Sequence, residues 1–326
     1  MREPLFLRQN RDTWLEYQRM LQKGENQDID PDRLAELYVQ LSNDLAFART
    51  FYPKSQTVKY LNGLAAHTHL AIYKNRKADR GKFLRFWTED LPIIIRESHA
   101  YILYAFIIFT ACLLWGWFGT ILDEDLPVKT LGWGYVAMTE SNVEAGNPTG
   151  VYQDMEQVQM FFYIAFNNIM VSFKVFVAGI VLTIGSIAYL FYNGIFIGTF
   201  FGLLWQQGVF AESMPIVFIH GTLELSAITI AGGAGIMMGN SFIFPGTYTR
   251  LQSLRKGAKR GIKIMVGLIP VFFIAAFLES FVTRYAEMPF ALNLLIILAS
   301  AFFILWYYVW YPFTVTRGGK GDVVEG

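Results

Sequence analysis

Residues 100–122 read AYILYAFIIFTACLLWGWFGTIL, 23 consecutive residues without a single charge. A helix crosses the roughly 30 Å hydrocarbon layer of a bilayer with about 20 apolar residues, so this stretch is long enough to span a membrane. Four further stretches are similar in length and character, and a shorter, glycine-rich stretch joins them. These are Val171–Tyr192, Met214–Met238, Ile262–Val282 and Pro289–Pro312, with Gly194–Phe210 as the short one. The sequence therefore predicts an all-α, polytopic transmembrane helix bundle of about six spans within residues 99–313.

The composition of the whole chain agrees with a membrane protein. Of its 326 residues, 54% are hydrophobic and 16% are charged, whereas soluble domains carry about a quarter charged residues. The formal net charge of +1 gives no reason to expect nucleic-acid binding. The single cysteine, Cys112, excludes an intramolecular disulfide framework. Charges interrupt Met1–Glu25 throughout, so no signal peptide is expected.

Residues 1–80 are predicted to form a cytoplasmic domain of amphipathic helices. Pro31, with Glu36 soon after it, marks a helix start, and apolar residues then recur at helical spacing. A second periodic stretch follows at Val58–Tyr73. Residues 81–98 come after a basic run and are expected to lie on the membrane surface as an amphipathic helix.

The lysines and arginines indicate the orientation of the spans. The basic run Lys74–Arg85 puts the N-terminus in the cytoplasm, whereas the acid-rich loop at 123–158 is expected outside it. The segment Asn240–Lys263 carries six basic residues and is expected inside. The chain must then cross an odd number of times between these two loops, so Gly194–Phe210 is predicted to cross fully rather than re-enter. We expect a multi-pass protein of the bacterial cytoplasmic membrane with both termini in the cytoplasm and a disordered tail at 314–326.

Ionisable residues inside spans are costly, about 2.5–3.5 kcal/mol for a charge at mid-bilayer, so each one needs an explanation. His220 and Glu224 are four residues apart and share one face of a helix. Glu279 lies near the outer end of the next span, and Lys174 is expected near the outer end of span two. The predicted topology brings six polar residues to a similar depth near the outer leaflet: His220, Glu224, Glu279, Lys174, Asn167 and Asn168.

Three interpretations of this polar cluster stay open. The side chains can pair with one another and lock the bundle, they can form a proton- or ion-coupled transport site, or they can form a metal or hydrolytic site. His220 and Glu224 supply two zinc-type ligands, but the sequence has no HExxH motif and no G-x-S-x-G motif. We therefore predict no metal, no cofactor and no enzymatic activity.

Small residues recur every four positions in two segments, which lets membrane helices approach closely. The two sets are Gly194, Gly198 and Gly202, and Ala231, Gly235 and Gly239. They are expected to pack within one bundle or against a second copy of the chain. Asn193-Gly194 is predicted to be the tight turn between spans two and three, with Val158–Ile169 forming an interfacial helix ahead of span two.

Several of these motifs together resemble the stage II sporulation protein M family. The resemblance rests on Phe166-Asn167-Asn168, Asn193-Gly194, His220-Gly-Thr-Leu-Glu224-Leu, Ala231-Gly-Gly-Ala-Gly235 and the segment IPVFFIAAFLESFVT, which contains Glu279. The N-terminal segments LYVQLSNDLAFARTFYP and VKYLNGLAAHTHLAIY resemble the longer, non-sporulation branch of that family. The resemblance implies an integral membrane protein, and the family's motif residues correspond here to His220, Gly221, Glu224, Glu279, Asn193 and Gly194. The sporulation member works with peptidoglycan-degrading partners at the septum.

Two functional hypotheses follow. The first is a membrane scaffold, as a homodimer, that organises cell-envelope protein partners and contacts membrane lipids but no nucleic acid. The second is a proton- or ion-coupled transporter or channel that uses the intramembrane His/Glu cluster. A scaffold predicts a dry, internally paired cluster, whereas a transporter predicts a water-filled cavity that reaches His220 and Glu224.

Overall fold

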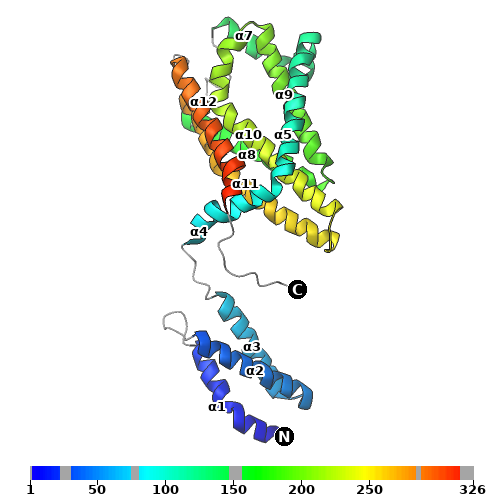
Figure 1. Cartoon of the computed structure of the whole chain (residues 1–326), viewed down its shortest axis with the longest axis vertical. Helices are drawn as coiled ribbons and strands as arrows, with labels where there is room; N and C mark the ends of the chain where they lie inside the picture. Colours follow the sequence, from blue (N-terminus) through cyan, green and yellow to red (C-terminus); the bar gives the residue numbers. More distant parts are fainter. Residues whose placement is uncertain (1, 23–30, 75–80, 147–155, 284–287, 316–326) are drawn as a thin grey trace. The chain divides into compact units, whose positions relative to one another are not determined.

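The computed structural model describes residues 2–22, 31–74, 81–146, 156–283 and 288–315. This part of the chain is 90% helical and contains no strand (Figure 1). It divides into two compact units, Met1–Lys82 and Phe83–Gly326. The predicted tail at 314–326 falls almost entirely outside the described residues.

The described residues of the N-terminal unit form three helices, α1 (Glu3–Gln22), α2 (Pro31–Phe51) and α3 (Gln56–Lys74). Their apolar faces meet in one core, as the helical spacing predicts. The buried members of this core are Phe6, Trp14, Tyr17, Leu37, Leu41, Ala48, Leu61 and Leu64. Trp14 Nε1 donates a hydrogen bond to Asp44 Oδ2 at 2.8 Å. Burial raises the pKa of the Asp44 carboxyl, and this hydrogen bond opposes the rise.

Glu3 ties the start of α1 to the connection between α2 and α3. Its carboxylate accepts hydrogen bonds from the hydroxyls of Ser55 and Thr57, the latter at 2.7 Å. These bonds stabilise the ionised form and lower the pKa of Glu3. The N-terminal unit is thus joined by polar contacts at its edge as well as by its core.

Among its described residues, the second unit contains six helices that are long and apolar enough to cross a membrane. A helix pairs its backbone groups within its own segment, which the hydrocarbon layer requires. The six helices are α4–η2–α5 (Gly81–Leu122), α8–η3 (Gln157–Ile180), α9 (Ile184–Gln206), α10 (Phe210–Ile243), α11–η4 (Arg250–Val282) and α12–η5–α13 (Phe290–Thr314). Two short helices, α6 (Leu126–Leu131) and α7 (Trp133–Glu144), lie between the first two spans. The prediction of an all-α, multi-pass membrane fold is confirmed.

The second and third spans begin and end at other residues than predicted. Residues 158–169 belong to α8 itself (Gln157–Val177) and not to a separate interfacial helix. The chain turns back at Leu182 and Thr183, whose φ angles are 51° and 68°, so Asn193-Gly194 lies inside α9 instead of forming the turn. Left-handed backbone at two successive non-glycine residues is rare, and the residue types give no indication of it, so the turn could not be predicted from the sequence. The glycine-rich segment is thereby part of a helix of full spanning length.

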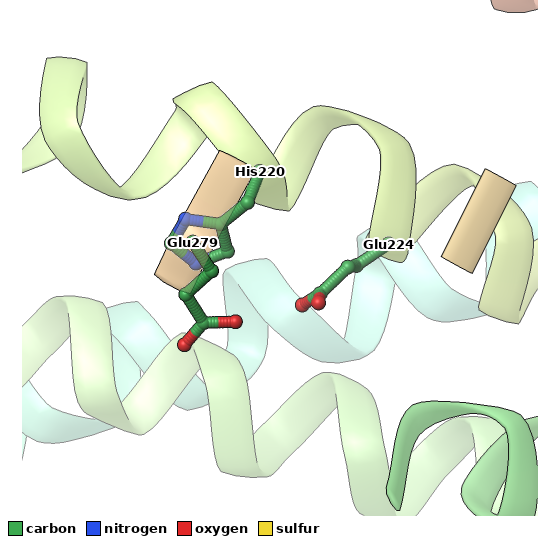
Figure 2. A group of neighbouring side chains, drawn as sticks. All are labelled: His220, Glu224 and Glu279. Carbon is green, nitrogen blue, oxygen red and sulfur yellow. The ribbon is translucent and has the colours of Figure 1, made fainter. Parts of the chain in front are cut away.

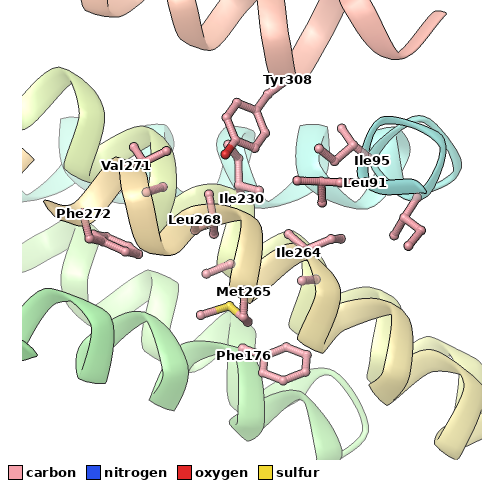
Figure 3. Packing of buried hydrophobic residues seen from close by; sticks show 14 of the residues in the cluster. Leu91, Ile95, Phe176, Ile230, Ile264, Met265, Leu268, Val271, Phe272 and Tyr308 are labelled. Carbon is pink, nitrogen blue, oxygen red and sulfur yellow. The ribbon is translucent and has the colours of Figure 1, made fainter. Parts of the chain in front are cut away.

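Residues 81–98 also differ from the predicted surface helix. They run on into α5 (Leu91–Leu122), and Leu91 and Ile95 are buried in the main core of this unit together with Ile264 and Leu268 of α11 (Arg250–Phe277) (Figure 3). Pro92 lies in the first turn of α5, directly after the π-helical segment η2 (Phe86–Asp90). A proline has no backbone N–H and so interrupts the helical hydrogen-bond pattern. A π turn beside it can accommodate that interruption.

Both sets of regularly spaced glycines serve packing inside one chain. The α5 and α9 helices lie side by side (Figure 1), and a Cβ added at Gly198 of α9 would meet the backbone carbonyl of Leu113 in α5. Gly194 and Gly202 likewise face α5. Gly235 of α10 faces the end of α8 and Ser186 of α9. The close approach that the sequence indicates therefore occurs within the bundle.

Candidate functional site

Three ionisable side chains from two spans meet in the membrane unit. His220 and Glu224 lie one turn apart on α10, and Glu279 comes from η4 (Leu278–Val282) at the end of α11. One ligand atom of each lies within 4.8 Å of the others. The carboxylates of Glu224 and Glu279 face one another (Figure 2), and all three side chains are partly buried. We call these three residues the His/Glu cluster.

The position of Glu279 depends on a local change of helix type. The α11 helix widens into a π turn at η4, where Thr283 N–H bonds to the Leu278 carbonyl at 2.8 Å. π turns of this kind recur at functional sites because they redirect side chains. Here the widened turn carries both Glu279 and the neighbouring Thr283 toward α10.

Two neutral side chains orient the His/Glu cluster. Asn168 of α8 donates from Nδ2 to Glu224 Oε1. The Thr283 hydroxyl lies 3.4 Å from His220 Nδ1 and donates its own hydrogen to the Leu278 carbonyl at 3.0 Å. With the hydroxyl hydrogen engaged there, a neutral imidazole would donate from Nδ1 in this contact and keep its lone pair on Nε2. The imidazole thus offers a basic nitrogen beside two carboxyl groups.

The structure does not bring Lys174 or Asn167 into the His/Glu cluster. Both side chains are exposed, and Lys174 lies in the last turn of α8, about 9 Å along the helix from Asn168 at 1.5 Å per residue. The prediction took Val171 as the start of this span, which put Lys174 near its beginning. Because α8 begins at Gln157, Lys174 lies near its end instead.

Within the described part of the chain, no lysine or arginine forms an ion pair with the two carboxyl groups. The ion pairs found there involve other residues: Arg33 with Glu16 and Glu36, Arg85 with Glu89, Lys129 with Asp123, and Arg260 with Glu97. Arg284, which follows Glu279 in the sequence, lies outside the described residues. The described site is therefore two acids, one imidazole and two neutral hydrogen-bonding groups. Chemically, such a set can take up and release a proton or hold a cation.

One contributor, Thr283, was not among the site residues predicted from the sequence. Thr283 follows directly after the predicted end of span five at Val282, so it appeared to belong to the loop. Its sequence signals were a hydroxyl four residues after Glu279, on the same helical face, and its place as the last residue of the segment IPVFFIAAFLESFVT. The motif residue Gly221 is not needed for close packing, since a Cβ there would meet only Val217, at 3.8 Å.

Comparison with protein families adds to this description. Residues 105–284, more than half of the chain, match the model of stage II sporulation protein M, and residues 4–74 match a domain of unknown function, DUF8413. No curated protein and no solved structure matches the chain. All residues of the His/Glu cluster, with Asn168 and Thr283, lie within the first match. The chain belongs to the stage II sporulation protein M family.

Proposed function

We propose that this protein is a transport protein of the bacterial cytoplasmic membrane, coupled to a proton or another cation that binds at the His/Glu cluster. The observation that carries the proposal is the convergence of His220, Glu224 and Glu279 inside apolar spans, with ligand atoms within 4.8 Å of one another. Both termini lie in the cytoplasm under this proposal, because the basic segments Lys74–Arg85 and Asn240–Lys263 favour the cytoplasmic side. It assigns the chain no enzymatic activity and no resident cofactor.

The physical argument starts from the two carboxyl groups. Two ionised carboxylates this close repel each other, and the repulsion is relieved when a proton or a metal cation binds between them. His220 Nε2 offers a third ligand to either species. Since Glu224 is on α10 and Glu279 is on η4, loading and unloading the site changes the force between two spans. A transporter needs such a link between occupancy and helix packing.

Two cavities of this unit are lined by neither His220 nor Glu224, and the contacts of the cluster to Asn168 and Thr283 are internal, as the scaffold hypothesis expects. Two other observations support the scaffold hypothesis less. A structural lock would pair each carboxylate with a cation, and Lys174, the expected partner, is exposed at the end of α8. The glycine faces that favoured a homodimer are covered by helices of the same chain. The N-terminal unit remains a surface on which envelope partners would bind under the scaffold hypothesis.

The test is ion flux into liposomes that contain the purified full chain. A pH-sensitive dye and, in parallel, a metal-sensitive dye are trapped inside, and a potassium gradient with valinomycin sets the membrane potential. We expect flux with the wild type and a loss of at least about tenfold with Glu224→Gln and with Glu279→Gln, since each removes one charged ligand. Glu212→Gln is the matched control, because Glu212 is exposed in the first turn of the same helix.

Thermal melting of the four proteins separates function from folding. Transport predicts lost flux with a melting temperature close to that of the wild type. Wild-type vesicles that leak no faster than protein-free vesicles would contradict transport. Equal flux in all four proteins, with lower melting temperatures for the two cluster variants, would instead favour a structural cluster in a scaffold.

A further inference from the structure

The other side of α10 carries a row of hydroxyl side chains. Thr222, Ser226 and Thr229 follow one another at four- and three-residue spacing and so share one face of the helix. At 100° per residue, Thr222 lies about 200° around the helix from His220. This face is thus directed away from the His/Glu cluster.

Two cavities open onto this face. The first, of about 530 Å³, lies between α5, α9 and α10, and the second, of about 620 Å³, lies between α5, α10 and the helix of span six. Phe106, Thr222, Ser226 and Thr229 line both cavities. Because they share these walls, the two cavities adjoin, and we call them together the α5–α10 groove.

The groove runs for most of the thickness of a bilayer. Along α5 its walls extend from His99 at one end to Trp117 at the other, which is about 27 Å at 1.5 Å per residue. The hydrocarbon layer is about 30 Å thick. Its walls are mainly apolar, so the groove has the length and the chemistry to take an extended acyl chain.

The wall from span six is fixed in place by hydrogen bonds. His99 Nε2 lies 2.8 Å from the Tyr308 carbonyl in the π-helical segment η5 (Leu305–Trp310). The Tyr308 hydroxyl donates to the Gly267 carbonyl of α11 at 2.9 Å. Because this wall is already fixed, less entropy is lost in ordering the site when a ligand binds.

A positive charge lies at the His99 end. The Arg96 guanidinium carbon is 6.0 Å from the ring centroid of Phe313, which lines the groove. Arg96 is exposed, and the ion pairs of the described residues do not include it. The apolar groove therefore ends at a cation, the pattern that complements an anionic lipid.

We propose that the α5–α10 groove is a binding site for an anionic phospholipid, with an acyl chain along α5 and α10 and the phosphate beside Arg96. This site goes beyond the proposed function, because it uses the opposite face of α10 and needs no cation at the His/Glu cluster. A phospholipid fits better than a soluble ligand, since the groove opens among helices that lie in the hydrocarbon layer.

The test measures retained lipid by native mass spectrometry of the full chain in mild detergent. Phosphatidylglycerol and phosphatidylcholine with the same acyl chains are the probes. We expect wild type to prefer phosphatidylglycerol about fivefold, the contribution of one basic residue near an anionic headgroup. Arg96→Gln should remove this preference. Ser226→Leu, which fills the shared wall, should lower the binding of both lipids.

Two controls keep the test decisive. Arg250→Gln is matched to Arg96→Gln, because Arg250 also lies over a phenylalanine, Phe242, at 5.8 Å but does not adjoin the groove. Glu224→Gln should leave lipid retention unchanged even if it abolishes flux. Equal binding of both lipids by wild type, an equal effect of Arg250→Gln and Arg96→Gln, or full retention in a folded Ser226→Leu protein would each overturn the proposal.

Discussion

Replacing Gly198 with alanine tests the packing that holds the membrane unit together. The added Cβ points at the backbone of Leu113 on α5, and its nearest neighbours are the carbonyl oxygen, the carbonyl carbon and Cα of that residue. Backbone atoms cannot move aside as a flexible side chain can, so α9 and α5 must separate. Overpacking of this kind costs about 1–3 kcal/mol.

A matched variant isolates that cost. Gly221→Ala places the same methyl group in another spanning helix, where its nearest neighbour is Val217 Cγ1 at 3.8 Å, an ordinary contact. Alanine is favoured over glycine in a helix by up to about 1 kcal/mol, but this gain is common to both variants and cancels in their difference. Gly198→Ala should therefore be about 1–3 kcal/mol less stable than Gly221→Ala.

The assay is thermal unfolding of the purified full chain in one detergent, followed by circular dichroism. For a unit of this size, 1 kcal/mol shifts the melting temperature by about 2–4 °C, so the variants should differ by about 2–12 °C. Gly198→Leu should melt lower still. If Gly198→Ala melts at or above Gly221→Ala, the close contact of α5 and α9 is refuted.

Three smaller predictions concern other contacts. Gly63→Ala in α3, where nothing lies within 4 Å of the added Cβ, should stabilise the N-terminal unit by about 0.5–1 kcal/mol in chemical denaturation; a loss of stability would contradict it. Tyr308→Phe removes the bond to the Gly267 carbonyl and should cost about 0.5–1.5 kcal/mol in thermal unfolding, so an unchanged melting curve would speak against that bond. The pKa of Glu3 is lowered in the folded unit. The ionised carboxylate therefore stabilises the fold fully at pH values above the unfolded pKa of about 4.3, and this stabilisation is lost as the pH falls through the folded pKa. Glu3→Gln should flatten this acid-side decline in tryptophan fluorescence, and an unaltered pH profile would exclude the contact.

The sequence carried enough information for the helices and for most of the His/Glu cluster. Uncharged runs of about 20 residues have few alternatives to membrane spans. The uneven placement of lysine and arginine indicates the orientation of the spans, which stays a prediction. The four-residue spacing of His220 and Glu224 put both on one face, and counting spans brought Glu279 to their depth. Asn168 contacts Glu224 because α8 packs against α10.

The errors in the second and third spans arise where apolar sequence continues through a change of backbone. Residues 157–206 contain only one charge, Lys174, so hydropathy marks no turn, and the reversal at Leu182-Thr183 depends on a backbone conformation that composition does not indicate. The predicted start of this span, Val171, is 14 residues after the actual start of α8 at Gln157. Lys174 was therefore expected near the beginning of its helix and lies near the end. The π segments η2, η4 and η5 were equally hidden, since nothing in their residues distinguishes a π turn from an α-helix.

The convergence of α10 and η4 at one point is the claim on which the proposed cation site depends, and a cysteine-pair measurement tests it most directly. In a chain whose buried Cys112 is replaced by alanine, His220→Cys with Glu279→Cys should chelate Cd²⁺ and resist alkylation by a maleimide, because thiolates bind soft cations tightly. The pair His220→Cys with Lys174→Cys should gain no protection. Protection of the second pair without the first would contradict the account.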